Sequence, residues 1–171
     1  RIVYEVAANW KIVVENFNEC LHCPTIHPEL VQVVPLYRFG EVWDDETGDD
    51  GNWMVEGASS FTRTGRSTLP PFPGLEPDDY RMYYGTFQFP NLMLNLHPDA
   101  GMAYIALPKG PNHTTVVSEY LFRPETIASP DFGGTMPSRV SAMRSMRCGA
   151  RNVSTSSRRW RRTSSSTASA F

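Results

Sequence analysis

The amino-acid sequence predicts an α+β domain, in which one helix packs against several antiparallel strands. One segment near the start, residues 10–23, has apolar residues at helical spacing. The later segments are short, rich in β-branched and aromatic residues, and separated by short turns. Short connections of this kind favour antiparallel pairing. About 40% of the residues are apolar, which is enough for a packed core.

The predicted helix covers residues 10–23. Its apolar residues recur at steps of four, three and four, and so share one face: Trp10, Val14, Phe17 and Leu21. Pro24 is expected to end the helix, because its ring clashes with a carbonyl of the preceding turn and it has no N–H to donate.

Short strands are predicted on both sides of this helix. One begins the chain at residues 1–5. After Pro28, residues 31–34 are expected to be a short extended segment, and residues 41–43 and 53–56 a hairpin around an acidic turn. Residues 68–79 hold four prolines and are predicted to be a loop. The main strands are predicted at residues 80–89, 92–97, 103–107 and 114–122.

The charge divides the chain into two parts. Residues 1–131 contain all 18 acidic residues, whereas residues 132–171 contain eight arginines, ten serines and no acid. We therefore predict a domain at 1–131 and a basic Ser/Arg-rich tail at 132–171 that is disordered or out of frame. A basic Ser/Arg tail could contact the phosphates of nucleic acid, but this composition favours an appendage without a function. We therefore expect no nucleic-acid partner.

The cell compartment is suggested by cysteines and hydropathy. The three cysteines are too few and too odd in number for a disulfide framework, which favours a reducing cytoplasm. No run of about 18 apolar residues occurs, so no membrane span is predicted. The first residues resemble a strand entered mid-gene, and we expect the chain to be a fragment.

The residues suited to chemistry lie together between residues 15 and 28. If the predicted helix is continuous, Glu15, Glu19 and His22 share one face. His27 follows the proline break, where a turn can bring it back toward His22. Two imidazoles presented in this way suit a divalent transition metal.

Spacing alone leaves three interpretations of this segment open. Iron(II) would use His22, His27 and a distant carboxylate, which together form a facial triad. Zinc would use Cys20 and Cys23 with one or both histidines, although residues at these steps cannot all face one ion on a helix. The histidines could also simply pack against or cap the helix end.

A family resemblance favours iron. Asn9-Trp10-Lys11, Glu15-Asn16-Phe17, Glu19-Cys20-Leu21-His22-Cys23 and His27-Pro28 resemble the mononuclear-iron motif of Rieske non-haem iron oxygenases. These are the α subunits of aromatic-ring-hydroxylating dioxygenases and of choline monooxygenase-like enzymes. The family pattern of an acid, two residues, His, four residues and His is matched by Glu19, His22 and His27. Residues 90–98 also resemble a core strand of the family.

The resemblance implies a fold and a set of roles. It implies a helix-grip (START-like) catalytic domain, an antiparallel sheet wrapped on a helix. His22 and His27 would bind Fe(II), and Glu19 would link the site to the Rieske [2Fe–2S] cluster of a neighbouring subunit in a homotrimer. Electrons would come from NAD(P)H through a reductase or ferredoxin, for O₂-dependent hydroxylation of a small organic substrate.

Two departures from the family pattern qualify this expectation. The Rieske cluster domain, which the family pattern expects ahead of this segment, is absent from this sequence. The third ligand, a carboxylate, would lie beyond residue 131, where the chain has no acid. We therefore expect this polypeptide alone to be inactive. A catalytically dead remnant and a small zinc-binding protein are the alternatives. The sequence does not separate an aromatic substrate from a quaternary ammonium, or one-oxygen from two-oxygen insertion.

Overall fold

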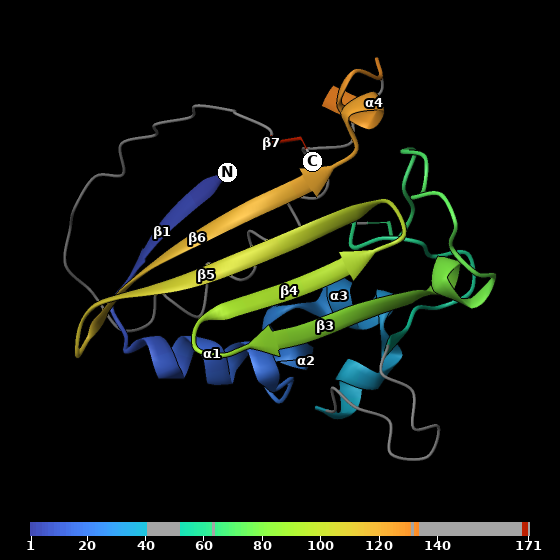
Figure 1. Ribbon diagram of the computed structural model, residues 1–171. Coiled ribbons are helices and arrows are strands. Elements are labelled where there is room, and N and C mark those ends of the chain that lie inside the picture. The colour runs from blue at the N-terminus through green and yellow to red at the C-terminus, as the bar shows by residue number, and fades with distance from the viewer. Residues whose placement is uncertain (41–51, 63, 131, 134–168, 171) are drawn as a thin grey trace.

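The structure of the protein, a computed structural model, describes residues 1–40, 52–62, 64–130, 132–133 and 169–170. Short helices precede most of the strands (Figure 1). The helical elements are α1 (Trp10–Asn18), α2 (Cys23–Ile26), α3 (Pro28–Val33), η1 (Pro35–Phe39), η2 (Asp78–Arg81) and α4 (Pro124–Ile127). The strands are β1 (Ile2–Val6), β2 (Asn52–Trp53), β3 (Met82–Gln88), β4 (Leu92–His97), β5 (Ala100–Gly110), β6 (His113–Phe122) and β7 (Ser169–Ala170).

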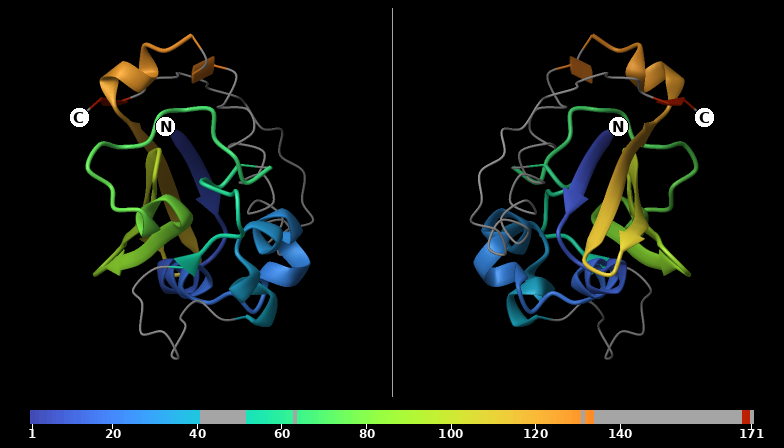
Figure 2. Two further views of the ribbon diagram at one scale, coloured as in Figure 1. Left: turned by 90° about the vertical axis from the view of Figure 1, so that its right-hand side faces the viewer. Right: turned by 90° about the vertical axis from the view of Figure 1, so that its left-hand side faces the viewer.

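Within the described residues, the strands form one sheet in the order β1-β6-β5-β4-β3-β2. All pairs along this path are antiparallel, and β3 to β6 are joined by hairpins. β7 pairs with the end of β6 in parallel. The predicted α+β class with an antiparallel sheet is therefore confirmed. The helix-grip arrangement follows from α1, α2 and α3, which gather on one side of the sheet (Figures 1 and 2).

The main strands were predicted well. Residues 92–97 form β4 with the predicted bounds, and the segments at 80–89, 103–107 and 114–122 correspond to β3, β5 and β6. β4 alternates strictly in burial along its last five residues, as expected for a strand with one covered face. The loop predicted at residues 68–79 is confirmed as far as residue 77, whereas Asp78 and Asp79 begin η2.

The long helix predicted over residues 10–23 is wrong in its second half. α1 begins at Trp10 and ends at Asn18. Asn9 caps its start, because the Asn9 side chain accepts the Lys11 backbone N–H at 3.0 Å. Glu19 has an extended backbone, with φ −122° and ψ 154°. Pro24 does not end a helix but lies in the first turn of α2, where a missing N–H costs nothing.

Residues 31–34 are also not the extended segment that we predicted. Val31 and Val33 lie in α3, which begins at Pro28 and has Glu29 in its first turn. A proline and an acid both favour a helix start at these positions. The apolar run is too short for periodicity to separate a strand from a buried helix.

Two further predictions are tested little or not at all. Of the hairpin predicted from residues 41–43 and 53–56, the first segment lies outside the described residues. In the second, β2 pairs with Tyr83 and Met82 of β3. Most of the predicted tail at 132–171 lies outside the described residues. No helix in the described part of the chain has the length and apolar character needed to cross a bilayer.

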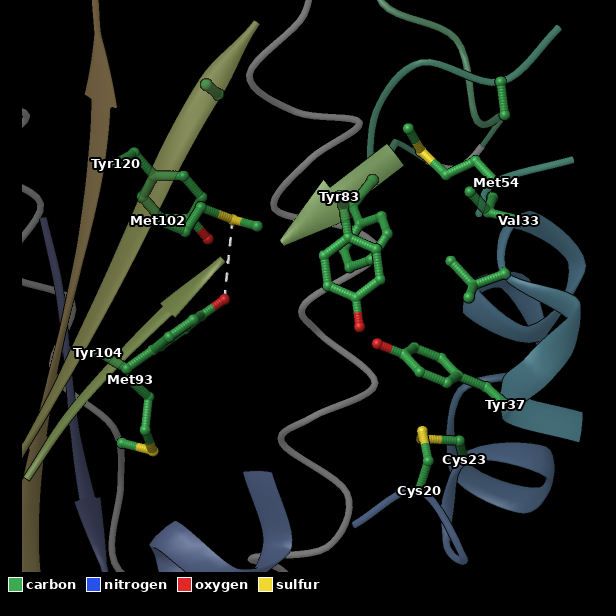
Figure 3. Close-up of a cluster of buried hydrophobic side chains, with 14 of the residues drawn as sticks. Cys20, Cys23, Val33, Tyr37, Met54, Tyr83, Met93, Met102, Tyr104 and Tyr120 are labelled. Carbon is green, nitrogen blue, oxygen red and sulfur yellow. Dashed lines mark hydrogen bonds between the residues drawn. A yellow bond between two sulfur atoms is a disulfide. The ribbon is translucent and has the colours of Figure 1, made fainter. Parts of the chain in front are cut away.

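The core lies between the sheet and the helices (Figure 3). Aromatic and sulfur-containing side chains dominate it, and β5 supplies Met102 and Tyr104, whose hydroxyl donates to the Met102 sulfur at 3.7 Å. On the helix side, Tyr37 from η1 points toward Tyr83 from β3. The core therefore joins the sheet to the segment that carries the two metal-ligand candidates.

Candidate metal centre

His22 and His27 lie at the two ends of α2. Their ring centroids are 5.1 Å apart and the ring planes meet at 81°. α2 is a single turn, in which the backbone N–H of His27 donates to the Cys23 carbonyl at 2.8 Å. This turn brings the second imidazole back toward the first, as the sequence predicted. The distance is short enough for both rings to approach one ion.

Glu19 orients the His22 ring. Its Oε1 lies 2.5 Å from His22 Nδ1, and its Oε2 accepts the Leu21 backbone N–H at 2.6 Å. An ionised carboxylate only accepts hydrogen bonds, so the His22 proton lies on Nδ1. Nε2 is then the ring nitrogen with a free lone pair for a metal. The contact forms across the end of α1 and not along a helix face, so the shared face predicted for Glu15, Glu19 and His22 is wrong.

The charge state of Glu19 follows from opposing effects. Partial burial raises the pKa of its carboxyl group, but hydrogen bonds from His22 and Asn16, the charge of His22 and the Leu21 N–H lower it. The net effect is a pKa below the usual value. Glu19 is therefore ionised at neutral pH and can hold the proton of the His22 ring.

His27 is held neutral by its surroundings. The residue is only 4% exposed. Burial, together with the charge of His22, lowers the pKa of its imidazole from 6.5 to about 4, against a smaller opposing effect of Glu29. A neutral imidazole is the form that binds metals, so His27 is ready to bind an ion at pH 7.

This low pKa predicts an acid-dependent stability of the metal-free protein. Between pH 6.5 and about 4 the unfolded chain binds the His27 proton and the folded chain does not. The free energy of unfolding should thus be largest above pH 6.5 and fall on acidification by on the order of 3 kcal/mol. Urea unfolding in the presence of a chelator, for the wild type and His27→Gln at pH 7 and 4.5, measures this loss. Parallel pH curves for the two proteins would contradict it.

A cavity of about 230 Å³ opens beside the two rings. Aromatic side chains form much of its wall, and polar groups lie near the histidines. The lining residues are Asn16, Phe17, Asn18, Glu19, Cys20, His22, Cys23, His27, Leu30, Tyr37, Phe61, Tyr83, Gly85 and Asn95. The cavity lies between the sheet and the segment that carries the histidines, and it has room for a small organic molecule.

The sheet side of the cavity is built by β3 and β4. Gly85 pairs with Asn95 in the strand register, and both line the cavity. A Cβ at position 85 would lie 3.3 Å from the Tyr83 ring and 3.5 Å from Asn95 Oδ1, so glycine keeps this wall open. His97, two residues beyond Asn95, is buried against the rings of Phe61 and Tyr83, at centroid distances of 4.3 and 5.8 Å.

The two neighbouring cysteines behave differently from what we expected. Cys20 and Cys23 form a disulfide, with their Cα atoms 4.9 Å apart. The end of α1 and the start of α2 bring them within the range that a disulfide spans. A sulfur in a disulfide is not a thiolate and cannot bind zinc. The disulfide between Cys20 and Cys23 therefore disfavours the zinc interpretation.

The residues present fit part of an iron site. Two convergent imidazoles, one neutral through burial and one oriented by a carboxylate, match two positions of a facial triad. Among the residues that the structure describes, no three acid, histidine or cysteine side chains converge closely enough to hold a metal. The iron-binding role of His22 and His27 stays a prediction, and so does the bridging role of Glu19.

Several cavity residues were missed by the sequence analysis. Tyr37 and Phe61 lie in segments without strand or long-helix periodicity, so no local pattern indicated that they face a cavity. Asn95 could have been found, because the period-2 alternation of β4 places it on the buried face between Met93 and His97. Asn16 was quoted only as part of the family motif.

Comparison with known proteins agrees with this fold. Residues 1–155 match the family described as "Ring hydroxylating alpha subunit (catalytic domain)". The match extends beyond residue 131, where we placed the domain boundary. The chain is 25% identical to the glycine betaine monooxygenase oxygenase subunit of Chromohalobacter salexigens, over 73% of this chain and 35% of that protein. It is 26% identical to the carnitine monooxygenase oxygenase subunit of Acinetobacter baumannii, over 74% of this chain and 28% of that protein.

A solved structure has a similar fold. The crystal structure of the quaternary ammonium Rieske monooxygenase CntA, in complex with an inhibitor, superposes with a TM-score of 0.51. The match covers 87% of this chain and 36% of that chain, at 20% sequence identity. This chain thus spans about a third of the length of the relatives that it matches.

Proposed function

This chain belongs to the ring-hydroxylating oxygenase α-subunit family, and on that premise we propose that His22 and His27 hold the mononuclear Fe(II) of a Rieske-type oxygenase. The family consists of iron-dependent oxygenases that use a Rieske cluster. The observation that carries the proposal is the approach of the two imidazole rings, 5.1 Å apart, beside a cavity. The reaction would be O₂-dependent hydroxylation of an organic substrate.

The residues of this chain would prepare the site in three ways. Burial keeps His27 unprotonated, and Glu19 holds the proton of His22 on Nδ1. The aromatic side chains of the cavity wall would offer an apolar surface for substrate. Iron, when bound, supplies the activation of dioxygen. The third position of the triad, a carboxylate, would lie beyond residue 131, where this chain has no acid, so the chain supplies two of the three ligands.

For the substrate we propose a small quaternary ammonium compound. The relatives named above are monooxygenases of glycine betaine and carnitine, and CntA is a quaternary ammonium monooxygenase. Tyr37, Phe61 and Tyr83 line the cavity. Aromatic faces attract a quaternary ammonium through cation–π interaction, with no need for a carboxylate at the cation.

For electron supply we propose that Glu19 faces the Rieske cluster of a neighbouring subunit in a homotrimer. Glu19 is about a third exposed while its carboxylate holds His22, so it can connect the iron ligand to the protein surface. A reductase or ferredoxin would deliver electrons from NAD(P)H to that cluster.

The metal preference of the chain tests this proposal. Anaerobic protein is incubated with Fe(II) and, separately, with Zn(II), desalted and analysed for metal, as the wild type and as the Cys20→Ser, Cys23→Ser double variant. We expect both proteins to bind the same amount of iron, because neither sulfur is a ligand. Stoichiometric zinc that requires both thiols would contradict the iron assignment and favour the small zinc-binding protein.

A further inference from the structure

Asn16 lies in the last turn of α1, beside both Glu19 and His22. Its Nδ2 is 3.1 Å from Glu19 Oε1, 2.9 Å from His22 Nδ1 and 3.3 Å from His22 Nε2. We propose that Asn16 is a positioning residue, whose amide fixes the Glu19 carboxylate and the His22 ring so that Nε2 of His22 is the metal-binding atom. The part of this inference that concerns metal rests on the proposed function.

Counting donors and acceptors gives one consistent assignment of these contacts. Glu19 Oε1 accepts the Nδ1–H of His22 and one N–H of the Asn16 amide. The Asn16 amide nitrogen and His22 Nδ1 both carry hydrogen, so their close approach is not a hydrogen bond. The amide nitrogen lies 2.9 Å from one ring nitrogen and 3.3 Å from the other, so it packs against the ring and does not lie along the lone pair of Nε2, which points away from Nδ1.

The end of α1 explains why this residue can reach both partners. The backbone N–H of Glu19 donates to the Glu15 carbonyl at 3.1 Å, after which the chain becomes extended. Glu19 then turns back over the last helical turn, three residues from Asn16. The amide thus holds the carboxylate in place.

Two consequences follow for the metal-free protein. The Nδ1–H form of His22 is favoured, since the carboxylate that accepts this proton is held by a second donor. The lone pair of Nε2 also stays open to a metal, because the amide lies against the ring and not along this lone pair. When a metal binds, the amide keeps its hydrogen bond to Glu19, so the ring does not lose its orientation. Side chains that support a metal ligand in this way typically change metal affinity about 10- to 100-fold.

The test reads the tautomer of His22 in metal-free, ¹⁵N-labelled protein by long-range ¹H–¹⁵N NMR. Asn16→Leu is nearly isosteric but has no donor, and Asn16→Gln keeps the amide. Asn18→Leu is the matched control, because Asn18 is the same residue type in the same turn and lines the same cavity. Asn16 is exposed, so these changes should leave the fold intact.

We expect the wild type to show the proton on Nδ1 of His22, and Asn16→Leu to show a mixture of both tautomers. Asn18→Leu should match the wild type, and Asn16→Gln should restore part of the preference. Fe(II) affinity should fall about tenfold in Asn16→Leu. An unchanged His22 spectrum in Asn16→Leu, or a wild-type proton on Nε2, would overturn the inference. Wild-type protein that shows the expected tautomer but binds no iron would overturn the proposed function instead.

Discussion

Replacing His27 with alanine is expected to lower the Fe(II) affinity of this chain by roughly 100-fold or more, because the site loses one of its two imidazole ligands. His22→Ala should have an effect of similar size. The two rings face each other at 5.1 Å, and neither can replace the other. Anaerobic titration against a competing chelator gives the affinity of each protein.

The matched control for these variants is His113→Ala. His113 is exposed at the start of β6. Its Nε2 forms a hydrogen bond with Glu5 Oε2 at 2.7 Å, on strands that do not line the cavity. Its loss should leave the Fe(II) affinity unchanged. Equal losses in the His27 and His113 variants would mean that iron binds to surface imidazoles, and the assignment of the site would be wrong.

Tyr83→Ala is expected to destabilise the fold by about 3–5 kcal/mol, the usual cost of removing a large buried aromatic side chain. Tyr83 is only 3% exposed, and its ring packs against Tyr37, Phe61 and His97 at centroid distances of 6.0, 4.5 and 5.8 Å. It joins β3 to the helical segment (Figure 3). Its removal would leave an enlarged cavity on the sheet side of the metal centre.

Urea unfolding measures this loss, and Tyr80→Ala provides the comparison. Tyr80 is the same residue type three positions earlier, in η2, and is 41% exposed. Its replacement should change the free energy of unfolding by no more than about 0.5 kcal/mol. If Tyr83→Ala costs less than about 1 kcal/mol, the packing described here does not hold the sheet against the helices.

The strands could be predicted because their signal is local. Residues 92–97 alternate between buried and more exposed positions, and the turns on both sides of this segment are short. β6 has a run of β-branched and aromatic residues, which is typical of a strand, and β5 pairs with it through a short turn. The helical segment could not be bounded in this way. Asn18 and Glu19 fit a helical pattern, but the hydrogen bonds of the Glu19 carboxylate to Leu21 and His22 favour an extended backbone there.

The two histidines were found from a motif and not from periodicity. The acid, His and His spacing resembled the Rieske oxygenase family, and the family match confirms that resemblance. Asn95 could be found from the alternation of β4, whereas Tyr37 and Phe61 come from separate segments that meet it only in the folded chain. Spacing within one segment carries no information about such distant contacts.

The most direct test of the two-histidine site is NMR of the four histidine rings during anaerobic Fe(II) titration. High-spin Fe(II) broadens the signals of nuclei close to it, and His22, His27, His97 and His113 can be told apart by single replacements. The account predicts that the ring signals of His22 and His27 broaden together at the lowest iron concentration, and that those of His113 stay sharp. Broadening of His113 first, or of only one ring of the pair, would contradict a shared ion.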